Sequence, residues 1–168
     1  NLEQEVQKRQ AEEQRRMALE EALAEPLAKG RITLDNGRIG ISGSVLFALN
    51  SDELQPEGRQ LLQSLVAPLQ VYLGEHDELL MVSGFTDDLP IQKNNYRYQD
   101  NWELSAQRAL TVTRALIEEG MPGELVFAAA FGAQQPVASN ADNAGRARNR
   151  RVEMAPVPRG REGTVADE

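Results

Sequence analysis

Short apolar stretches alternate with amphipathic helical stretches between residues 31 and 155, and this order limits the available folds more than any other sequence feature. A hairpin comes first, because apolar residues at alternate positions flank Asn36 and Gly37, a pair suited to a tight turn. The periodicity then predicts helices at 57–74 and 102–119 and strands at 78–84, 125–132 and 150–155. This order predicts an α+β fold, a two-layer sandwich with helices packed on one face of a mixed β-sheet.

Both ends of the chain differ in composition from this central part. Residues 1–29 are rich in Glu, Gln, Arg and Ala, with few apolar residues and no sustained heptads. They predict an N-terminal helix that serves as a linker or stalk and lies outside the core. Residues 156–168 are expected to form a disordered tail. The domain itself is therefore expected to span 30–155.

Two polar stretches inside the domain, 85–101 and 133–149, are expected to be loops. Pro68 lies inside the first long helix and should kink or split it, because proline removes one backbone hydrogen bond. Loops carry functional residues more often than the elements they connect. Both stretches are therefore candidate locations for a site.

Composition excludes several classes of protein. The chain of 168 residues has no Cys and one His, which excludes disulfide scaffolds, thiolate zinc sites and a Cys nucleophile and disfavours His-dependent triads. No cofactor or metal site is expected. Its 26 acidic residues outweigh 18 Lys and Arg, and the net charge of −8 disfavours nucleic-acid binding, which needs a basic face. No apolar run is long enough to span a membrane.

Arg108 is the most informative single residue. At 100° per residue it falls within the apolar arc that runs from Leu104 through Val112 to Leu116. A guanidinium at the margin of a core cannot lose its charge, so it needs an anionic partner or a ligand. A structural ion pair with an internal Asp and a ligand site both remain open.

Thr86, Asp87 and Asp88 directly follow the strand expected at 78–84. A loop at the end of a strand projects its side chains beside neighbouring helix termini, so Asp87 could reach the helix that carries Arg108. Such a pair would form a receptor for a zwitterion, in which the carboxylate binds an ammonium group and the guanidinium binds a carboxylate. The alternative is that both aspartates only form a turn in a solvated loop.

Four arginines lie within six residues, at Arg146, Arg148, Arg150 and Arg151. Clustered arginines bind phosphate, carboxylate or nucleic acid. The alternative interpretation is an edge strand that its charges protect from aggregation.

The motifs that follow one another along the chain are Phe47-Ala-Leu-Asn-Ser-Asp-Glu-Leu54, Val82-Ser-Gly-Phe-Thr-Asp87, Asn101-Trp-Glu-Leu-Ser-Ala-Gln-Arg108-Ala109, Gly132, Pro136, Asn140 and Gly145-Arg-Ala-Arg-Asn-Arg-Arg-Val152. In order and spacing they resemble the OmpA-like peptidoglycan-binding domain, and within that family the MotB-type periplasmic domain. The resemblance covers about 31–155, which is most of the chain.

The resemblance implies non-catalytic binding of peptidoglycan. In the family, the Asp of the Thr-Asp motif and the Arg of the Leu-Ser-x-x-Arg-Ala motif hold the free amino and carboxylate end of meso-diaminopimelate in the stem peptide. These match Asp87 and Arg108. The full set of expected peptidoglycan-binding residues is Asp87, Arg108, Asn101, Thr86, Leu104 and Arg150. Phe85 replaces the usual His of the family's Gly-His-Thr-Asp motif, so affinity or ligand preference is expected to differ.

The resemblance further implies a periplasmic protein tethered to a membrane through its polar N-terminal helix. A MotB-like stator component and a general envelope anchor both fit, and a homodimer and a membrane stator partner are further expectations. A cell-wall hydrolase that uses Asp87 and Asp88 is disfavoured, because adjacent residues rarely place two carboxylates across a glycosidic bond. Whether the loop at 88–100 gates the pocket stays open.

Overall fold

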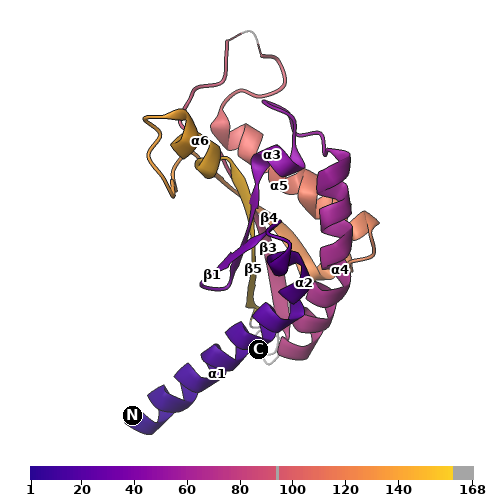
Figure 1. Ribbon diagram of the computed structural model, residues 1–168, viewed down its shortest axis with the longest axis vertical. Helices are drawn as coiled ribbons and strands as arrows, with labels where there is room; N and C mark the ends of the chain where they lie inside the picture. Colours follow the sequence, from indigo (N-terminus) through magenta and orange to yellow (C-terminus); the bar gives the residue numbers. More distant parts are fainter. Residues whose placement is uncertain (94, 161–168) are drawn as a thin grey trace, which may run out of the picture.

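A five-stranded mixed sheet forms the centre of the computed structural model, which describes residues 1–93 and 95–160 (Figure 1). The strands are β1 (Thr33–Asp35), β2 (Arg38–Ser42), β3 (Glu78–Phe85), β4 (Val126–Gly132) and β5 (Arg151–Pro158). Their order in the sheet is β1-β2-β5-β3-β4, and only the β3–β4 pair is parallel. The helical elements are α1 (Leu2–Ala22), α2 (Ala24–Ala28), α3 (Gly43–Leu46), α4 (Pro56–His76), α5 (Asn101–Glu118), η1 (Gly123–Leu125) and α6 (Asn143–Asn149).

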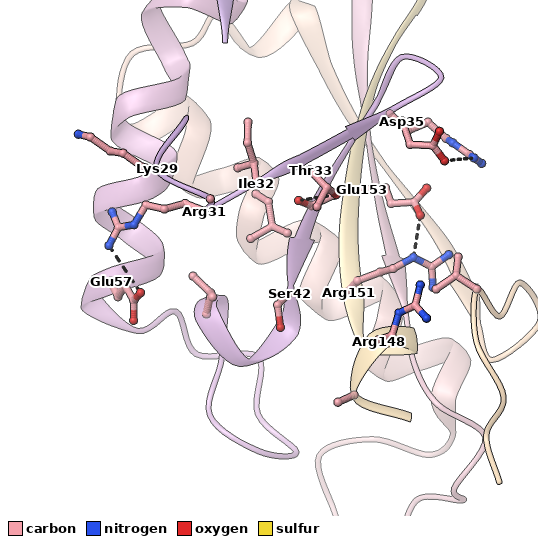
Figure 2. Close-up of a pocket in the computed structure, with 17 residues that line it drawn as sticks. Lys29, Arg31, Ile32, Thr33, Asp35, Ser42, Glu57, Arg148, Arg151 and Glu153 are labelled. Carbon is pink, nitrogen blue, oxygen red and sulfur yellow. Dashed lines mark hydrogen bonds and ion pairs between the residues drawn. The ribbon is translucent and has the colours of Figure 1, made fainter. Parts of the chain in front are cut away.

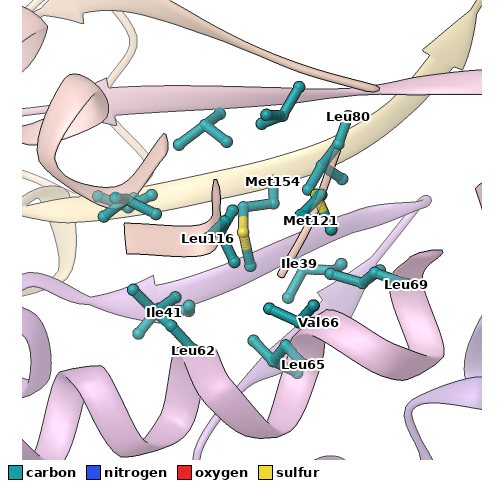
Figure 3. Packing of buried hydrophobic residues seen from close by; sticks show 14 of the residues in the cluster. Ile39, Ile41, Leu62, Leu65, Val66, Leu69, Leu80, Leu116, Met121 and Met154 are labelled. Atoms are coloured by element: carbon teal, nitrogen blue, oxygen red, sulfur yellow. The ribbon is translucent and has the colours of Figure 1, made fainter. Parts of the chain in front are cut away.

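The hydrophobic core lies between one face of the sheet and the long helices α4 and α5 (Figures 1 and 3). Leu62, Leu65 and Leu69 of α4 recur at helical spacing and are buried against the sheet. Ile41 and Met154 come from the facing strands. The predicted α+β sandwich with helices on one face of a mixed sheet is therefore confirmed.

The predicted hairpin and long helices are present. Asn36 and Gly37 both have positive φ, 54° and 80°, as a two-residue hairpin turn with this twist requires. The expectation that Pro68 would split its helix is wrong, because α4 runs unbroken from Pro56 to His76. Its neighbours Leu65 and Leu69 are fully buried, and this burial outweighs the one lost backbone hydrogen bond.

Several boundaries differ from the expectation. The polar stretch at 133–149 contains the helix α6, which is short and polar and therefore leaves no apolar periodicity in the sequence. β5 continues beyond 155 to Pro158, and the rest of the expected tail, 161–168, lies outside the described residues. β5 also lies between β2 and β3, so the edge-strand interpretation of the arginine cluster is wrong.

The polar N-terminal helix projects from the domain, but its last turns belong to the core (Figure 1). Leu19 and Leu23 are buried together with residues of α4 and the sheet. The expectation that this segment lies wholly outside the core is therefore wrong for its end. The sparse leucines of a mostly polar segment concealed this packing.

A glycine lets α5 approach β3 at the point nearest the candidate site. A Cβ atom at Gly84 would lie 2.2 Å from the backbone oxygen of Ser105 in α5. The close contact places the first turns of α5 directly above the end of β3. Side chains from both elements can therefore share one cavity.

Gly84→Ala should lower the free energy of unfolding by about 1–3 kcal/mol, because the added methyl group forces the two backbones apart. The matched control is Gly74→Ala in α4, where an added Cβ meets nothing within 4 Å, and which should be neutral or slightly stabilising. Urea denaturation of the three proteins measures both effects. Equal stabilities of the two variants would contradict the close contact.

Candidate functional site

A cavity of about 220 Å³ opens where the end of β3, the first turns of α5 and the α6–β5 junction meet. All six residues expected from the sequence line this cavity: Thr86, Asp87, Asn101, Leu104, Arg108 and Arg150. Thr86 and Asp87 follow β3, the next three residues lie on one face of α5, and Arg150 immediately precedes β5. The structure thus brings the set together, and its role in ligand binding stays a prediction.

Arg108 lies almost wholly out of solvent, with 5% of its surface exposed. Its Nε donates to the backbone oxygen of Ser51 at 2.9 Å, and its guanidinium carbon lies 5.1 Å from the centre of the Phe47 ring. Within the described chain its two Nη atoms have neither a hydrogen-bond partner nor an ion-pair partner, and neither atom is sealed from solvent. The structural ion pair considered for Arg108 is therefore not formed within these residues, and its remaining donors are available to a ligand.

Burial lowers the pKa of Arg108, because the charged form loses its hydration. The charge of Arg150 lowers that pKa further, whereas Tyr98, Asp87 and Asp52 raise it. A guanidinium stays protonated in proteins despite such a shift. The cavity therefore holds a permanent, poorly solvated positive charge.

Asp87 has a different partner from the one expected. Its Oδ2 accepts a hydrogen bond from Nη1 of Arg150 at 2.6 Å, and its Oδ1 accepts one from the backbone N–H of Leu89 at 3.1 Å. Arg108 interacts with Asp87 only through the electrostatic field. The site thus combines two guanidinium groups with one carboxylate, and its local charge favours an anion.

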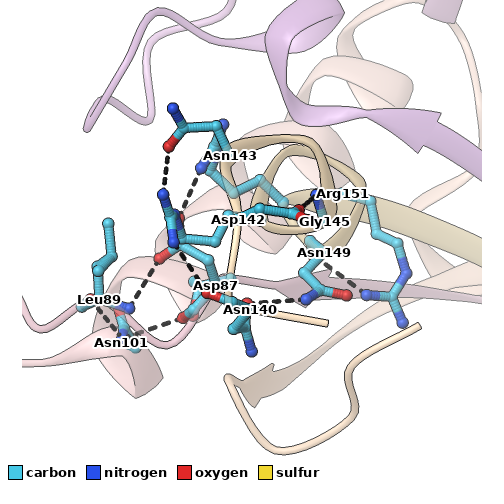
Figure 4. Close-up of polar contacts among 12 residues, drawn as sticks. Asp87, Leu89, Asn101, Asn140, Asp142, Asn143, Gly145, Asn149 and Arg151 are labelled. Atoms are coloured by element: carbon cyan, nitrogen blue, oxygen red, sulfur yellow. Dashed lines mark hydrogen bonds and ion pairs between the residues drawn. The ribbon is translucent and has the colours of Figure 1, made fainter. Parts of the chain in front are cut away.

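Thr86 and Asn101 hold the backbone that carries Asp87, and Figure 4 shows the contacts of Asn101 with this loop. The Asn101 side-chain amide donates to the backbone oxygens of Leu89, at 3.0 Å, and of Asp87, at 3.3 Å. The Thr86 N–H donates to Gly132 in β4 at 2.8 Å, and its hydroxyl donates to the Asp87 oxygen at 2.8 Å. The side chains of Thr86 and Asn101 therefore hold the loop through these hydrogen bonds. Leu104 adds an apolar side chain to the lining of the cavity.

The contacts that hold Arg108 were not assigned from the sequence. Phe47 and Ser51 lie in a motif that was recognised, but a backbone carbonyl carries no sequence signal and the pairing spans 57 positions. The neighbouring Leu49 and Asn50 also line the cavity. The loop at 88–100 contributes Pro90 and Ile91, among others, to the lining of the cavity.

Phe85 does not line this cavity. Its ring lies parallel to that of Phe131, with centroids 4.9 Å apart, and 3.8 Å from the guanidinium carbon of Arg151. These residues line a separate hollow on the sheet face opposite the core. The Phe85 side chain, which stands where the family usually has His, is therefore not one of the side chains that line the cavity.

A larger hollow, about 750 Å³, lies beside β1 and β2 and contains none of the expected site residues (Figure 2). Two of its ion pairs are long and partly exposed, at 3.5 Å for Arg31–Glu57 and 3.7 Å for Arg38–Asp35, and a third, Arg151–Glu153, is short at 2.7 Å and mostly buried. Surface pairs such as the first two contribute little energy, and in the third the charge of Arg151 is already paired with Glu153. The smaller cavity is therefore the better candidate, because it contains the buried Arg108.

Residues 1–93 and 95–160 contain neither a cluster of metal-binding side chains nor a membrane-spanning helix. No group of three or more His, Asp or Glu side chains there is arranged to hold a metal ion. None of the helices in the same ranges is both long and apolar enough to cross a membrane.

The known proteins that this chain resembles include a motility protein and a peptidoglycan-binding protein. Motility protein B of Bacillus subtilis is 44% identical over 82 residues, which cover 48% of this chain and 31% of that protein. Peptidoglycan-binding protein ArfA of Mycobacterium tuberculosis is 31% identical over 112 residues, which cover 67% of this chain and 32% of that protein. The chain spans less than two thirds of the length of the first curated relatives that it matches.

The fold recurs in the cell wall anchor of the T6SS from Pseudomonas aeruginosa. That structure superposes with a TM-score of 0.69 at 32% sequence identity, over 84% of this chain and 97% of the other. Residues 46–150, more than half of the chain, match the profile of the OmpA family. The motifs around Asp87 and Arg108 lie within that match, and the chain is a member of the OmpA family.

Proposed function

We propose that this chain binds peptidoglycan without cleaving it, and that its cavity holds the zwitterionic end of meso-diaminopimelate. The observation that carries the proposal is the buried Arg108, whose two Nη atoms have no partner within the described chain. A charge removed from water is costly unless it is paired, so a carboxylate ligand is the natural group to complete this site. A volume of about 220 Å³ suits the end of one amino acid better than a whole sugar chain.

Asp87 supplies the second half of the recognition. Each of its oxygens has one hydrogen-bond donor in the protein, and an ionised carboxylate can accept about four. It can therefore receive the ligand's ammonium group while it remains bonded to Arg150. The arrangement predicts preference for a ligand that carries both an ammonium and a carboxylate on one carbon.

Cleavage of the cell wall fits the geometry poorly. Asp88 is exposed and does not line the cavity, so it and Asp87 do not face a common substrate position. Glycoside hydrolysis needs two carboxyl groups about 5–10 Å apart on either side of the scissile bond. A binding role agrees with the names of the relatives ArfA and the cell wall anchor.

The proposed biological role is to anchor a membrane-attached protein to the cell wall from the periplasm. The match to Motility protein B favours a stator component, with a homodimer and a membrane partner as part of that proposal. The match to a cell wall anchor of a different machine favours the alternative of a general envelope anchor.

Sedimentation with purified sacculi that contain meso-diaminopimelate tests the site. Arg108→Gln and Asp87→Asn should each weaken binding by about tenfold or more, because each removes one charge-assisted contact. The matched control is Arg114→Gln, which changes an exposed arginine of the same helix and should bind normally.

Circular dichroism shows which variants remain folded. If Arg108→Gln unfolds, Arg108→Lys keeps the charge but loses the planar fork, and it should fold and bind weakly. Folded Arg108 and Asp87 variants that sediment like the wild type would overturn the site assignment. Release of soluble muropeptides by the wild type would overturn the non-catalytic proposal.

Gene deletion in the source bacterium separates the two anchoring roles. A stator component predicts cells that still assemble flagella but do not swim, because the motor lacks its anchored torque generator. Electron microscopy and swimming assays measure the two properties, and complementation with the intact gene is the control. Normal swimming of the deletion strain would contradict the stator role and favour the general envelope anchor.

A further inference from the structure

The side chain of Arg151 joins four segments of the chain on the sheet face opposite the core. Its Nε donates to Oε2 of Glu153 at 2.7 Å, its Nη1 to the backbone oxygen of Asn149 at 3.1 Å and its Nη2 to that of Gln135 at 3.0 Å (Figures 2 and 4). The guanidinium also stacks on the Phe85 ring at 3.8 Å. Arg151 thus contacts β5, the end of α6, the β4–α6 loop and β3, and it does not line the ligand cavity.

Phe85 and Arg151 are direct cross-strand partners in the antiparallel pair of β3 and β5. Phe85 is in turn stacked on Phe131 of β4, with an angle of 6° between the rings. The stack therefore ties three adjacent strands together at the end of the sheet where the site begins. Thr86 and Asp87 follow Phe85, and Arg150 precedes Arg151.

Arg150 directly precedes the stacked Arg151 in the chain. Successive side chains along an extended backbone point to opposite faces, so fixing Arg151 on the outer face directs Arg150 toward the inner side. The Arg150 side chain forms one ion pair within the described chain, to Asp87 at 2.6 Å. Its backbone is fixed by hydrogen bonds from its N–H to Arg146 and from Gly43 to its oxygen. Nothing else among the described residues orients its guanidinium.

Asn149 fixes the α6 side of the α6–β5 junction through its side-chain hydrogen bonds. Its buried amide accepts from the N–H groups of Val137 and Ala138 and donates to Ala138 and Asn140 (Figure 4). The Arg151 contact to the Asn149 oxygen therefore connects β5 to an already rigid α6 and loop. Arg150 is the single residue between these two parts, and because hydrogen bonds to Arg146 and Gly43 hold its backbone, a loosened Arg151 would change chiefly the direction of its side chain.

We propose that Arg151, stacked on Phe85, is a positioning residue for the ligand cavity and acts through Arg150. It holds the α6–β5 junction so that Arg150 stays bonded to Asp87 and the Asp87 carboxylate keeps the orientation that receives the ligand's ammonium group. The proposal rests on the proposed function for its ligand. In this proposal, Phe85 supports the site from the outer face of the sheet and does not contact the ligand.

A double-mutant cycle with meso-diaminopimelate as the probe tests this coupling. Titration calorimetry compares the wild type, Arg151→Gln, Arg150→Gln and the protein with both changes. Arg151→Gln should weaken binding by about fivefold, and the same change should have no further effect when Arg150 is already Gln. The matched control is Arg148→Gln, an exposed arginine of the same cluster, which should bind like the wild type.

The aromatic partner provides a conservative rescue. Phe85→Tyr keeps the ring under the guanidinium and should retain affinity, whereas Phe85→Leu removes the stack and should weaken binding as Arg151→Gln does. These variants also keep the proposal testable if Arg151→Gln does not fold. Equal affinities of the two Phe85 variants would contradict it, as would additive losses in the double mutant.

A measurement without ligand distinguishes this proposal from the proposed function. The Nε–H signal of Arg150 in the nitrogen-15 NMR spectrum should move in Arg151→Gln and Phe85→Leu, and stay in place in Arg148→Gln. A wild type that does not bind the probe would overturn the proposed function and leave this test intact. An unmoved Arg150 signal in folded variants would overturn the positioning role.

Discussion

The burial of one permanent positive charge governs the architecture around the candidate site. Arg108 lies on the inner face of α5, and α5 can lie so close to β3 only because Gly84 has no side chain. The protein satisfies one part of the guanidinium with the Ser51 oxygen and another with the face of Phe47. The two Nη atoms remain for a group outside the described chain. An anion in the cavity would complete the solvation that folding removed.

The site has a front and a back, and the two differ in chemistry. The front is the cavity, where Asp87 and Arg108 present opposite charges without bonding each other. The back is the stack of Phe131, Phe85 and Arg151 on the outer face of the sheet. Arg150 connects the two, since it follows the rigid α6 and precedes β5. Under the proposed positioning role, a change in the family motif at Phe85 would influence binding without touching the ligand.

Periodicity was sufficient to predict the individual strands, both long helices and the place of Arg108 on the apolar face of its helix, because each depends on residues close in sequence. The Asp87–Arg150 pair was not predicted, since it joins positions 63 apart whose registry depends on the order of strands. The helix α6 was missed because its seven residues bury only Gly145 and Asn149, which produce no apolar pattern. The packing of Leu19 and Leu23 was concealed by the charged residues around them.

The central claim is that the cavity recognises a zwitterionic amino-acid end through Arg108 and Asp87. A nitrogen-15 NMR titration of the protein with meso-diaminopimelate tests it most directly, with Nα-acetyl-lysine as the control, because that compound carries its ammonium group and its carboxylate on different carbons. The claim predicts saturable shifts that centre on Asp87, Asn101 and the Arg108 side chain and are absent with Nα-acetyl-lysine. A folded protein whose spectrum does not change, or whose shifts cluster at the hollow beside Arg31 and Arg38, would contradict it.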